Sequence, residues 1–247
     1  MSSIIDVVDV EKGFQTGPVL KGVSFELAKG ETLVVMGGSG SGKTVLLRLI
    51  AGLLQPDAGQ IRVFDRNIEH LGEEELLPIR RRLGYVFQGA ALFDSLSVYE
   101  NVAYPLREHT RLSEAEIRQR VIHFLSLVGL NDAILGLLPA ELSGGMRKRV
   151  GIARALVGEP ETMLYDEPTA GLDPTNSKLV TELIVQMRAG VCDCAIVVTH
   201  DVELARSVAD RMAVLIDGRF AAMGPPAEVM ASSDPAVQSF LAGDARP

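Results

Sequence analysis

The sequence predicts an α/β protein with a mainly parallel core sheet, an N-terminal antiparallel β subdomain and an inserted helical subdomain. Three observations lead to this prediction. The chain begins with alternating apolar and polar residues, its later apolar strands alternate with helical segments, and the segment 90–139 lacks strand patterns. A length of 247 residues with 47% hydrophobic content supports a substantial core.

The N-terminal part is expected to form antiparallel strands. The stretches "IIDVVDVEKGF" and "VLKGVSFELAKGE" alternate apolar and polar residues on either side of a turn signal at Gly17-Pro18. An apolar strand, "TLVVM", then leads through a glycine-rich loop into an apolar helix ending near Gly52 and Pro56. A second hairpin-like segment, "GQIRVFDRNI", a charged helix, "EEELLPIRRRL", and a strand, "LGYVFQ", ending at Gln88 follow.

The rest of the chain is expected to be helical first and α/β afterwards. A capping box at Ser113 and Glu116 opens one of the helices in the middle segment. Strands "ETMLYDE" and "CAIVVTH" then flank the helix "TNSKLVTELIVQMRAG", and a hairpin, "RMAVLIDGRFAAMG", precedes a short helical tail. We expect one domain with a core at residues 1–89 and 140–225, a helical subdomain at 90–139 and a tail at 226–247.

Composition excludes several classes of protein. A net charge of −8 argues against a general nucleic-acid binder, and the apolar stretches are shorter than the roughly 20 residues that cross a bilayer. The N-terminus lacks the pattern of an export signal, so we expect a cytosolic location. Cys192 and Cys194 are interpreted as reduced structural thiols, because no second cysteine pair or nearby histidine cluster completes a zinc site.

The stretch "GGSGSGKT", Gly37 to Thr44, is typical of a phosphate-binding loop. It fits G-x-x-x-x-G-K-[ST] and lies between a predicted strand and a predicted helix. Backbone N–H groups of such a loop point at phosphate oxygens, and the helix adds the positive end of its dipole. We expect Lys43 to reach the β- and γ-phosphates and Thr44 to offer its hydroxyl to Mg²⁺.

Two carboxylates follow a second apolar strand. Asp166 and Glu167 end "TMLYDE", which places them at the C-terminal edge of a sheet, where α/β sites form. Asp166 is expected to hold Mg²⁺ through water, and Glu167 to orient and deprotonate the attacking water. Gln88 and His200 each end an apolar strand and would project from the same edge toward the γ-phosphate, with an ordinary turn residue as the alternative for both.

Taken in order, these motifs resemble the ATP-binding cassette (ABC) ATPases over nearly the whole chain. They comprise the Walker A loop at Gly37 to Thr44, the Q-loop Gln88, the signature "LSGGM" at Leu142 to Met146, the Walker B acids Asp166 and Glu167, the D-loop "AGLD" at Ala170 to Asp173 and the H-loop His200. The resemblance implies an ATPase in which two cassettes face each other head to tail. Each ATP then lies between the Walker A loop of one copy and the signature of the other.

The resemblance also assigns the site residues. Glu167, His200, Lys43 and Gln88 are the expected catalytic residues, and Thr44, Gln88 and Asp166 are the expected Mg²⁺ ligands. The expected ATP-binding residues are Phe14, Gly37, Gly38, Ser39, Gly40, Ser41, Gly42, Lys43, Thr44, Gln88, Ser143, Gly144, Gly145 and Asp173. Ser143, Gly144 and Gly145 would present N–H groups, a hydroxyl and a helix N-terminus to a γ-phosphate held by the second copy.

Two of the remaining features, Phe14 and a basic run, have competing interpretations, and Asp173 has one expected role. Phe14 either stacks on adenine, where the family usually has a tyrosine, or is a core residue of a strand. Asp173 is expected to couple the two ATP sites across the dimer. The basic run Arg147, Lys148 and Arg149 is interpreted as a solvated charged face in preference to a contact with anionic lipid.

The segment after Gln88 indicates a branch of the family. The runs "FQGAALFDSLSV" and "NVAYPLREHT", with "GGMRKRVGIARAL" later, are similar to the ATPase of the Mla phospholipid transporter and its relatives that serve MCE lipid-binding proteins. This similarity implies two copies of the chain beneath integral-membrane permease subunits, at the cytoplasmic side of the inner membrane, with a periplasmic MCE protein and a cytosolic STAS-type subunit. The tail "DPAVQSFLAGDARP" would either cross to the neighbouring copy or fray.

The leading hypothesis is therefore an ATP-driven phospholipid transport subunit working between the inner and outer membranes. An ABC ATPase for another cargo, such as an amino acid or a hydrophobic compound, would use the same catalytic residues. A soluble regulatory cassette without a membrane partner is the third hypothesis. Cargo selection lies mainly in other subunits, so the motifs of this chain separate these hypotheses only weakly.

Overall fold

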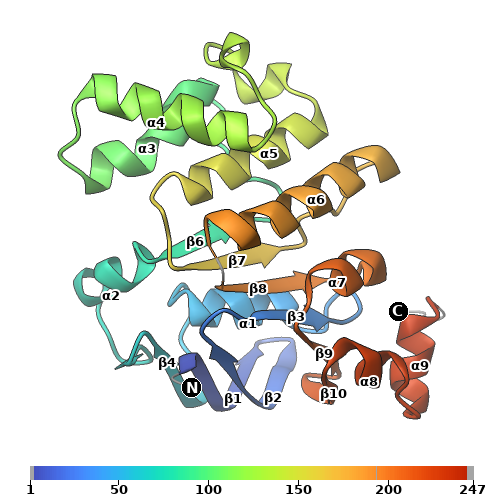
Figure 1. The fold of residues 1–247 in the computed structure, drawn as a ribbon. Coiled ribbons are helices and arrows are strands. Elements are labelled where there is room, and N and C mark those ends of the chain that lie inside the picture. The colour runs from blue at the N-terminus through green and yellow to red at the C-terminus, as the bar shows by residue number, and fades with distance from the viewer. Residues whose placement is uncertain (1–2, 193, 244–247) are drawn as a thin grey trace. The chain divides into compact units, whose positions relative to one another are not determined.

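The computed structural model describes residues 3–192 and 194–243, which form two compact units (Figure 1). Within the described residues, the first unit combines 3–80 with 194–243, and the second consists of 81–192. The predicted fold class is confirmed, because helices alternate with strands that pair antiparallel near the N-terminus and mostly parallel in the core. In the part of the chain that is described, none of the helices is long and apolar enough to cross a bilayer.

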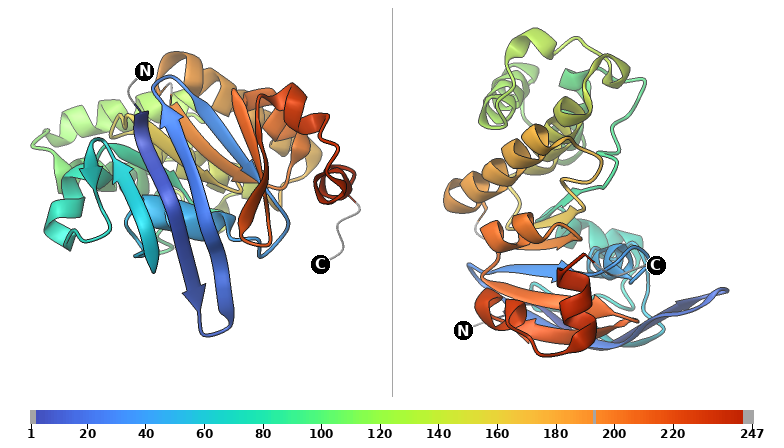
Figure 2. Two further views of the ribbon diagram at one scale, coloured as in Figure 1. Left: turned by 90° about the horizontal axis from the view of Figure 1, so that it is seen from below. Right: turned by 90° about the vertical axis from the view of Figure 1, so that its right-hand side faces the viewer.

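An antiparallel sheet with the strand order β2-β1-β4-β5 forms one layer of the first unit. Its strands are β1 (Ser3–Phe14), β2 (Gly17–Ala28), β4 (Ala58–Val63) and β5 (Arg66–Asn67). Figure 2 shows β1 and β2 as a long hairpin. Its strands contribute Ile5, Val10, Leu20 and Leu27 to the buried core. The two N-terminal hairpins predicted from the alternating pattern are therefore present.

A second group of strands in this unit has the order β10-β9-β3-β8. They are β3 (Thr32–Met36), β8 (Cys194–Thr199), β9 (Arg211–Ile216) and β10 (Arg219–Gly224). The helices of the unit are α1 (Lys43–Ile50), α2 (Glu73–Arg80), α7 (Val202–Val208), α8 (Pro226–Met230) and α9 (Pro235–Leu241). β3 is buried along its whole length and pairs in parallel with both β8 and β9, as expected for a central strand covered on both faces.

The second unit is mainly helical. It contains the parallel strands β6 (Leu83–Val86) and β7 (Thr162–Asp166), the 3₁₀ turns Asp132–Ile134 and Pro139–Glu141, and the helices α3 (Val98–His109), α4 (Glu114–Leu127), α5 (Gly144–Leu156) and α6 (Pro174–Gly190). Helices α3, α4 and α5 contact one another. The predicted subdomain limits at 90 and 139 remain a prediction, since the compact unit has wider bounds.

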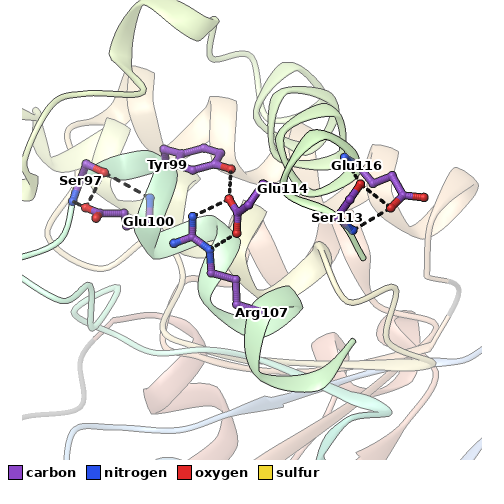
Figure 3. A network of polar contacts seen from close by, with 7 residues as sticks. All are labelled: Ser97, Tyr99, Glu100, Arg107, Ser113, Glu114 and Glu116. Atoms are coloured by element: carbon purple, nitrogen blue, oxygen red, sulfur yellow. Dashed lines mark hydrogen bonds and ion pairs between the residues drawn. The ribbon is translucent and has the colours of Figure 1, made fainter. Parts of the chain in front are cut away.

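Two capping boxes open the helices α3 and α4 (Figure 3). The Ser113 hydroxyl accepts from the Glu116 N–H while the Glu116 carboxylate accepts from the Ser113 N–H at 2.7 Å. Ser97 and Glu100 form the same pair at the start of α3. The first box was predicted, and the second has the same Ser-x-x-Glu spacing.

A polar network joins the two capped helices (Figure 3). The Arg107 guanidinium donates to both carboxylate oxygens of Glu114 at 2.8 and 2.7 Å, and the Tyr99 hydroxyl donates to the same carboxylate at 3.1 Å. Arg107 also lies over the Tyr99 ring, 5.4 Å from its centroid. The guanidinium holds the pKa of Glu114 below its usual value. Because bidentate pairs fix geometry, this network orients the start of α4 against α3.

Candidate functional site

The glycine-rich loop joins β3 to α1, as the motif predicts. Met36 ends β3 and Gly42 precedes α1 with a φ of 106°, a conformation that favours glycine. A Cβ on Gly37 would lie 2.5 Å from the Leu215 carbonyl oxygen, so this position admits no side chain without a backbone shift. Gly38 and Gly40 have open space where a Cβ would be. The loop is thus fixed at its ends and open in its middle.

Lys43 and Ser41 place polar atoms inside this loop. The Lys43 ammonium donates to the carbonyl oxygens of Gly37 at 2.8 Å and Gly38 at 2.9 Å, and the side chain is only 7% exposed. The Ser41 hydroxyl is buried and has no hydrogen-bond partner among the described residues. An unsatisfied buried hydroxyl is costly, and a phosphate oxygen would satisfy it. These groups therefore fit a bound polyphosphate.

A cavity of about 740 Å³ borders the loop within the first unit. Residues 38–41 form one wall, and Lys21, Asp217 and Phe240 contribute to the others. Phe240 belongs to α9, whose Val237 is fully buried and whose first turn is capped by Asp234. The interpretation of this tail as frayed is therefore wrong for α9, while residues 244–247 of the tail lie outside the described residues.

His200 follows β8 directly, in the same unit as the Walker A loop. Thr199, its predecessor, pairs with Met36, so both strands end side by side where the loop begins. The next residue, Asp201, accepts hydrogen bonds from the N–H groups of Glu203 and Leu204 and caps α7. The exposed His200 side chain is thus held at the carboxyl edge of the strand pair.

Phe14 ends β1 and is 47% exposed, so it is not a core residue. The Lys12 ammonium lies 5.7 Å from the centroid of its ring and forms an ion pair with Asp57 at 2.6 Å. This ion pair and the Gly13 N–H hold the pKa of Asp57 below its usual value. A ring that is exposed to this extent can stack on another aromatic group.

The Walker B acids end β7 in the second unit. Asp166 is the last residue of the strand, and the Tyr85 hydroxyl lies 3.4 Å from its carboxylate. Glu167 follows with a φ of 47°, which is uncommon for a residue with a side chain. Both acids are almost completely buried. Burial and unusual backbone geometry together are typical of functional carboxylates.

Lys148 lies beside these acids, which the sequence did not predict. Its side chain is 6% exposed, and its ammonium donates to the carbonyl oxygen of Gln88 and, at 3.1 Å, to that of Glu167. Burial lowers the pKa of Lys148, while the carboxylates of Glu167 and Asp166 oppose this shift. The interpretation of Lys148 as part of a solvated charged face is wrong.

The same correction applies to Arg149. Its guanidinium donates to the Gly129 carbonyl oxygen at 3.1 Å, and burial lowers its pKa. Arg147 remains exposed. The three basic residues point in different directions because successive helix positions are 100° apart, since a turn takes 3.6 residues. A run of like charges in a helix is therefore no guide to one charged face.

Gln88 lies in a turn after β6, because the strand ends at Val86 and not at Gln88 as predicted. Ala90 and Ala91 follow with φ values of 63° and 47°. Arg154 of α5 donates to the carbonyl oxygens of both alanines at 2.8 Å and lies over the Phe93 ring. Two hydrogen bonds from one partly buried guanidinium thus hold this unusual backbone.

The loop that follows is held by Asn101, a fully buried residue of α3. Its amide donates to the carbonyl oxygens of Phe93, Leu96 and Ser97 at 3.0 to 3.1 Å and accepts from the Phe93 N–H at 2.8 Å. Asn101 begins the run "NVAYPLREHT" that indicated a branch of the family. Its role in the described residues is to shape this loop.

The signature turn opens α5. Ser143 accepts from the Met146 N–H at 3.2 Å and caps the helix, and it is exposed. The first N–H groups of an α-helix have no acceptor within the helix, so Gly144 and Gly145 can offer theirs to an anion. A Cβ on Gly145 would meet the Asn176 side chain at 2.3 Å, whereas one on Gly144 would meet its nearest atom at 3.7 Å.

Asp173 caps α6 in the described structure. Its carboxylate accepts from the N–H groups of Thr175 and Asn176 at 3.1 Å and from the Asn176 amide at 2.6 Å. These hydrogen bonds hold the pKa of Asp173 below its usual value. Asn176 is the residue against which Gly145 packs, so the D-loop and the signature turn share one contact.

The structure thus brings the expected residues together in two sets. Lys43, Thr44, His200 and Phe14 belong to the first unit, and the described hydrogen bonds tie Gln88 to Glu167 through Lys148 in the second. Such a strand, loop and helix with a phosphate cradle define a P-loop nucleotide-binding protein.

Comparison with known proteins gives the family. The sequence profile described as "ABC transporter" matches residues 20–170. The chain belongs to the ABC transporter family as an ATP-binding, ATP-hydrolysing cassette.

Three curated relatives are similar along almost the whole chain. The probable ribonucleotide transport ATP-binding protein mkl of Mycobacterium leprae is 40% identical over 98% of this chain and 70% of its own length. The methionine import ATP-binding protein MetN of Mesorhizobium japonicum is 39% identical over 99% of this chain and 66% of its own length. The intermembrane phospholipid transport system ATP-binding protein MlaF of Escherichia coli K12 is 38% identical over 98% of this chain and 90% of its own length.

Solved structures agree with this assignment. A dimeric, post-hydrolysis structure of the ATP-binding cassette MJ0796 bound to ADP and Pi has a TM-score of 0.83 and 33% sequence identity. It covers 90% of this chain and 98% of that one. The likeness extends over both units, so the chain has the fold of an ABC cassette.

Proposed function

We propose that this ABC ATPase energises phospholipid transport between the inner and outer membranes, together with an MCE-type system. The observation that supports this cargo is the 38% identity to MlaF over 98% of this chain and 90% of that protein. The similarity to mkl and MetN leaves a larger part of each relative unmatched. The run "NVAYPLREHT" after the Q-loop adds support, because it is similar to the ATPase of the Mla phospholipid transporter.

Residues 37–44 hold the phosphates of ATP in this proposal. The open middle of the loop at Gly38 and Gly40 lets backbone N–H groups approach phosphate oxygens, and the buried Ser41 hydroxyl gains a partner. Lys43 exchanges loop carbonyls for the β- and γ-phosphates. Phe14 stacks on adenine with its exposed ring.

Mg²⁺ would be held by Thr44, Gln88 and Asp166 together with the nucleotide, since hydroxyl, amide and carboxylate oxygens are ligands that this ion prefers. When bound, the ion neutralises charge on the phosphates. Glu167 orients the attacking water and accepts its proton, and His200 contacts the γ-phosphate from the edge of β8.

We further propose that two copies form a head-to-tail dimer. Ser143, Gly144 and Gly145 would offer their hydroxyl and N–H groups to the γ-phosphate held by the other copy. Asp173 would link the two sites through Asn176 and the signature turn. Hydrolysis removes the bridging anion, which biases the dimer toward its open state.

The proposed partners are integral-membrane permease subunits, a periplasmic MCE lipid-binding protein and a cytosolic STAS-type subunit. The chain would be peripheral at the cytoplasmic side of the inner membrane. Pulling the native complex from detergent-solubilised membranes tests this assembly. We expect a permease and an MCE protein in the complex, with phospholipid in the extract.

Two outcomes would contradict phospholipid transport and favour another function. A methionine-binding protein in the complex would favour amino-acid import, to which the similarity to MetN points. Recovery of the native chain entirely in the cytosolic fraction, with no permease, would favour a regulatory cassette instead.

The role of Glu167 has its own test. Glu167→Gln should retain ATP binding and trap the closed dimer, because an amide cannot accept the proton of the attacking water. Turnover should fall by about 100-fold or more, in line with losses seen when a group acting in the transition state is removed. Turnover equal to that of the wild type would refute the assignment as base.

A further inference from the structure

Helix α5 carries two cationic side chains, the buried Lys148 and the partly buried Arg154, that donate hydrogen bonds to backbone carbonyl groups. Lys148 donates to the carbonyl oxygens of Gln88 and Glu167, and Arg154 donates to those of Ala90 and Ala91. We call Lys148, Arg154 and these four carbonyl groups the α5 clamp. The clamp joins the helix that begins at the signature to the Q-loop and the Walker B turn.

The acceptors of the clamp lie in unusual backbone. Ala90, Ala91 and Glu167 have φ values of 63°, 47° and 47°. A residue with a side chain adopts this region at a cost, and it stays there only when neighbouring groups hold it. Hydrogen bonds from α5 reach the carbonyl group of each of these three residues. The clamp is therefore placed to maintain the conformation on which the direction of the Glu167 side chain depends.

Tight packing leaves this part of α5 little freedom. A Cβ on Gly151, one turn after Lys148, would lie 3.2 Å from the Ala90 Cβ. Lys148 itself is almost completely buried, although lysine rarely is unless it is paired. Its two carbonyl acceptors are 60 and 19 residues away in sequence, so the contact exists only in the folded unit.

We propose that Lys148 is a positioning residue for ATP hydrolysis. By hydrogen-bonding both carbonyl oxygens at once, it fixes Glu167 and Gln88 relative to each other and to the helix that follows the signature. This inference rests on the proposed roles of Glu167 and Gln88. It adds a group that acts through the backbone carbonyl groups of Gln88 and Glu167.

Lys148→Met tests the proposal, because methionine fills a similar space and donates no hydrogen bond. We expect kcat for ATP to fall by up to about 100-fold, as for a catalytic group displaced by about 1 Å, with KM for ATP unchanged within about twofold. Lys178→Met is the matched control, since that lysine side chain is 78% exposed on α6 of the same unit. The control should keep wild-type kcat.

Glu167→Gln provides the readout that a purely structural role would not give. If Lys148 acts through Glu167, adding Lys148→Met to Glu167→Gln should lower the residual turnover by less than about twofold, because coupled residues are non-additive. The proposal would be overturned if the fall in kcat of the double variant equalled the product of the falls in the two single variants. It would also be overturned if Lys148→Met kept wild-type kcat, or if its KM for ATP rose as much as its kcat fell. Wild-type turnover of Glu167→Gln alone would instead refute the assigned base.

Thermal unfolding of each variant shows whether it is folded. Should Lys148→Met fail to fold, Lys148→Gln is assayed by the same criteria, since its amide nitrogen lies one bond closer to the backbone than the ammonium and does not reach both carbonyl oxygens. Wild-type kcat and KM in a folded Lys148→Gln would overturn the proposal. A loss confined to kcat, and absent when Glu167→Gln is already present, supports it.

Discussion

Lys43 and Lys148 are buried to nearly the same degree, at 7% and 6% exposure, and each ammonium donates to two backbone carbonyl groups. The acceptors of Lys43 lie six and five residues before it, whereas those of Lys148 lie 60 and 19 residues away. A lysine that binds its own loop belongs to a short motif. A lysine that joins distant segments is visible only once the chain has folded.

The helices behind the two glycine-rich turns differ in a related way. Gly42, which precedes α1, has no side chain to cap that helix, whereas the Ser143 side chain caps α5. The signature turn is therefore capped by a side chain of the protein, and the Walker A turn is not capped at Gly42. In the proposed function, the Walker A turn binds the nucleotide of its own chain and the signature turn contacts that of the other copy.

The largest expected effect tests whether the Walker A turn of one chain works together with the signature turn of another chain. Lys43→Ala should abolish ATP binding and hydrolysis, whereas Ser143→Arg should abolish hydrolysis and preserve binding by the same chain. Each loss of hydrolysis should reach about 100-fold, the scale for removing a transition-state donor. Mixing the two variants should restore hydrolysis, because a mixed dimer contains one intact pair of turns.

Nucleotide binding and phosphate release measured on the separate and mixed variants check this expectation. Mixing either variant with itself is the control. A mixture as inactive as its components would show that the signature turn does not serve the partner's nucleotide.

A smaller effect concerns the fixed and open parts of the Walker A turn. Gly37→Ala should lower the free energy of unfolding by about 1–3 kcal/mol, because its Cβ would press on the Leu215 carbonyl oxygen. Gly38→Ala should leave it unchanged, since no atom lies within 4 Å of the added carbon. Denaturant unfolding without nucleotide measures both, and equal losses would contradict the described packing.

The smallest effect distinguishes the two signature glycines. Gly145→Ala should lower the free energy of unfolding by about 1 kcal/mol, because its Cβ displaces the flexible Asn176 side chain and breaks the hydrogen bond of Asn176 to Asp173. Gly144→Ala should leave the free energy of unfolding unchanged or raise it slightly, since alanine favours the helix. Thermal unfolding gives the comparison.

Adding Asn176→Ala to Gly145→Ala makes room for the new methyl group. The double variant should therefore be no less stable than Asn176→Ala alone. A full additive loss would mean that Gly145 is required for another reason.

Local sequence patterns predicted much of the fold and the nucleotide loop. The capping box at Ser113, the N-terminal hairpins and the strand before Gly37 depend on neighbouring residues, so short patterns reveal them. The second box at Ser97 has the same signal and could have been found. The strand before Gln88 ends earlier than predicted because its apolar run continues into a turn that Lys148 and Arg154 hold.

The second unit's polar contacts could not be predicted in this way. Lys148 and Arg149 follow each other in a basic run, yet each binds carbonyl groups of a different distant segment. Asn101 likewise closes its loop through four hydrogen bonds that no motif announces. Such partners depend on tertiary packing, which overrides the solvated face that charge alone suggests.

The single ammonium group shared by Gln88 and Glu167 makes the positions of two segments thermodynamically interdependent. A contact that favours one position of the Gln88 carbonyl group therefore shifts the equilibrium between Glu167 conformations. The size of this shift is the coupling free energy between the two segments. The reverse holds equally. A protein that binds the loop after Gln88 and stimulates hydrolysis by this route should therefore bind more tightly when Glu167 is in its hydrolytic position.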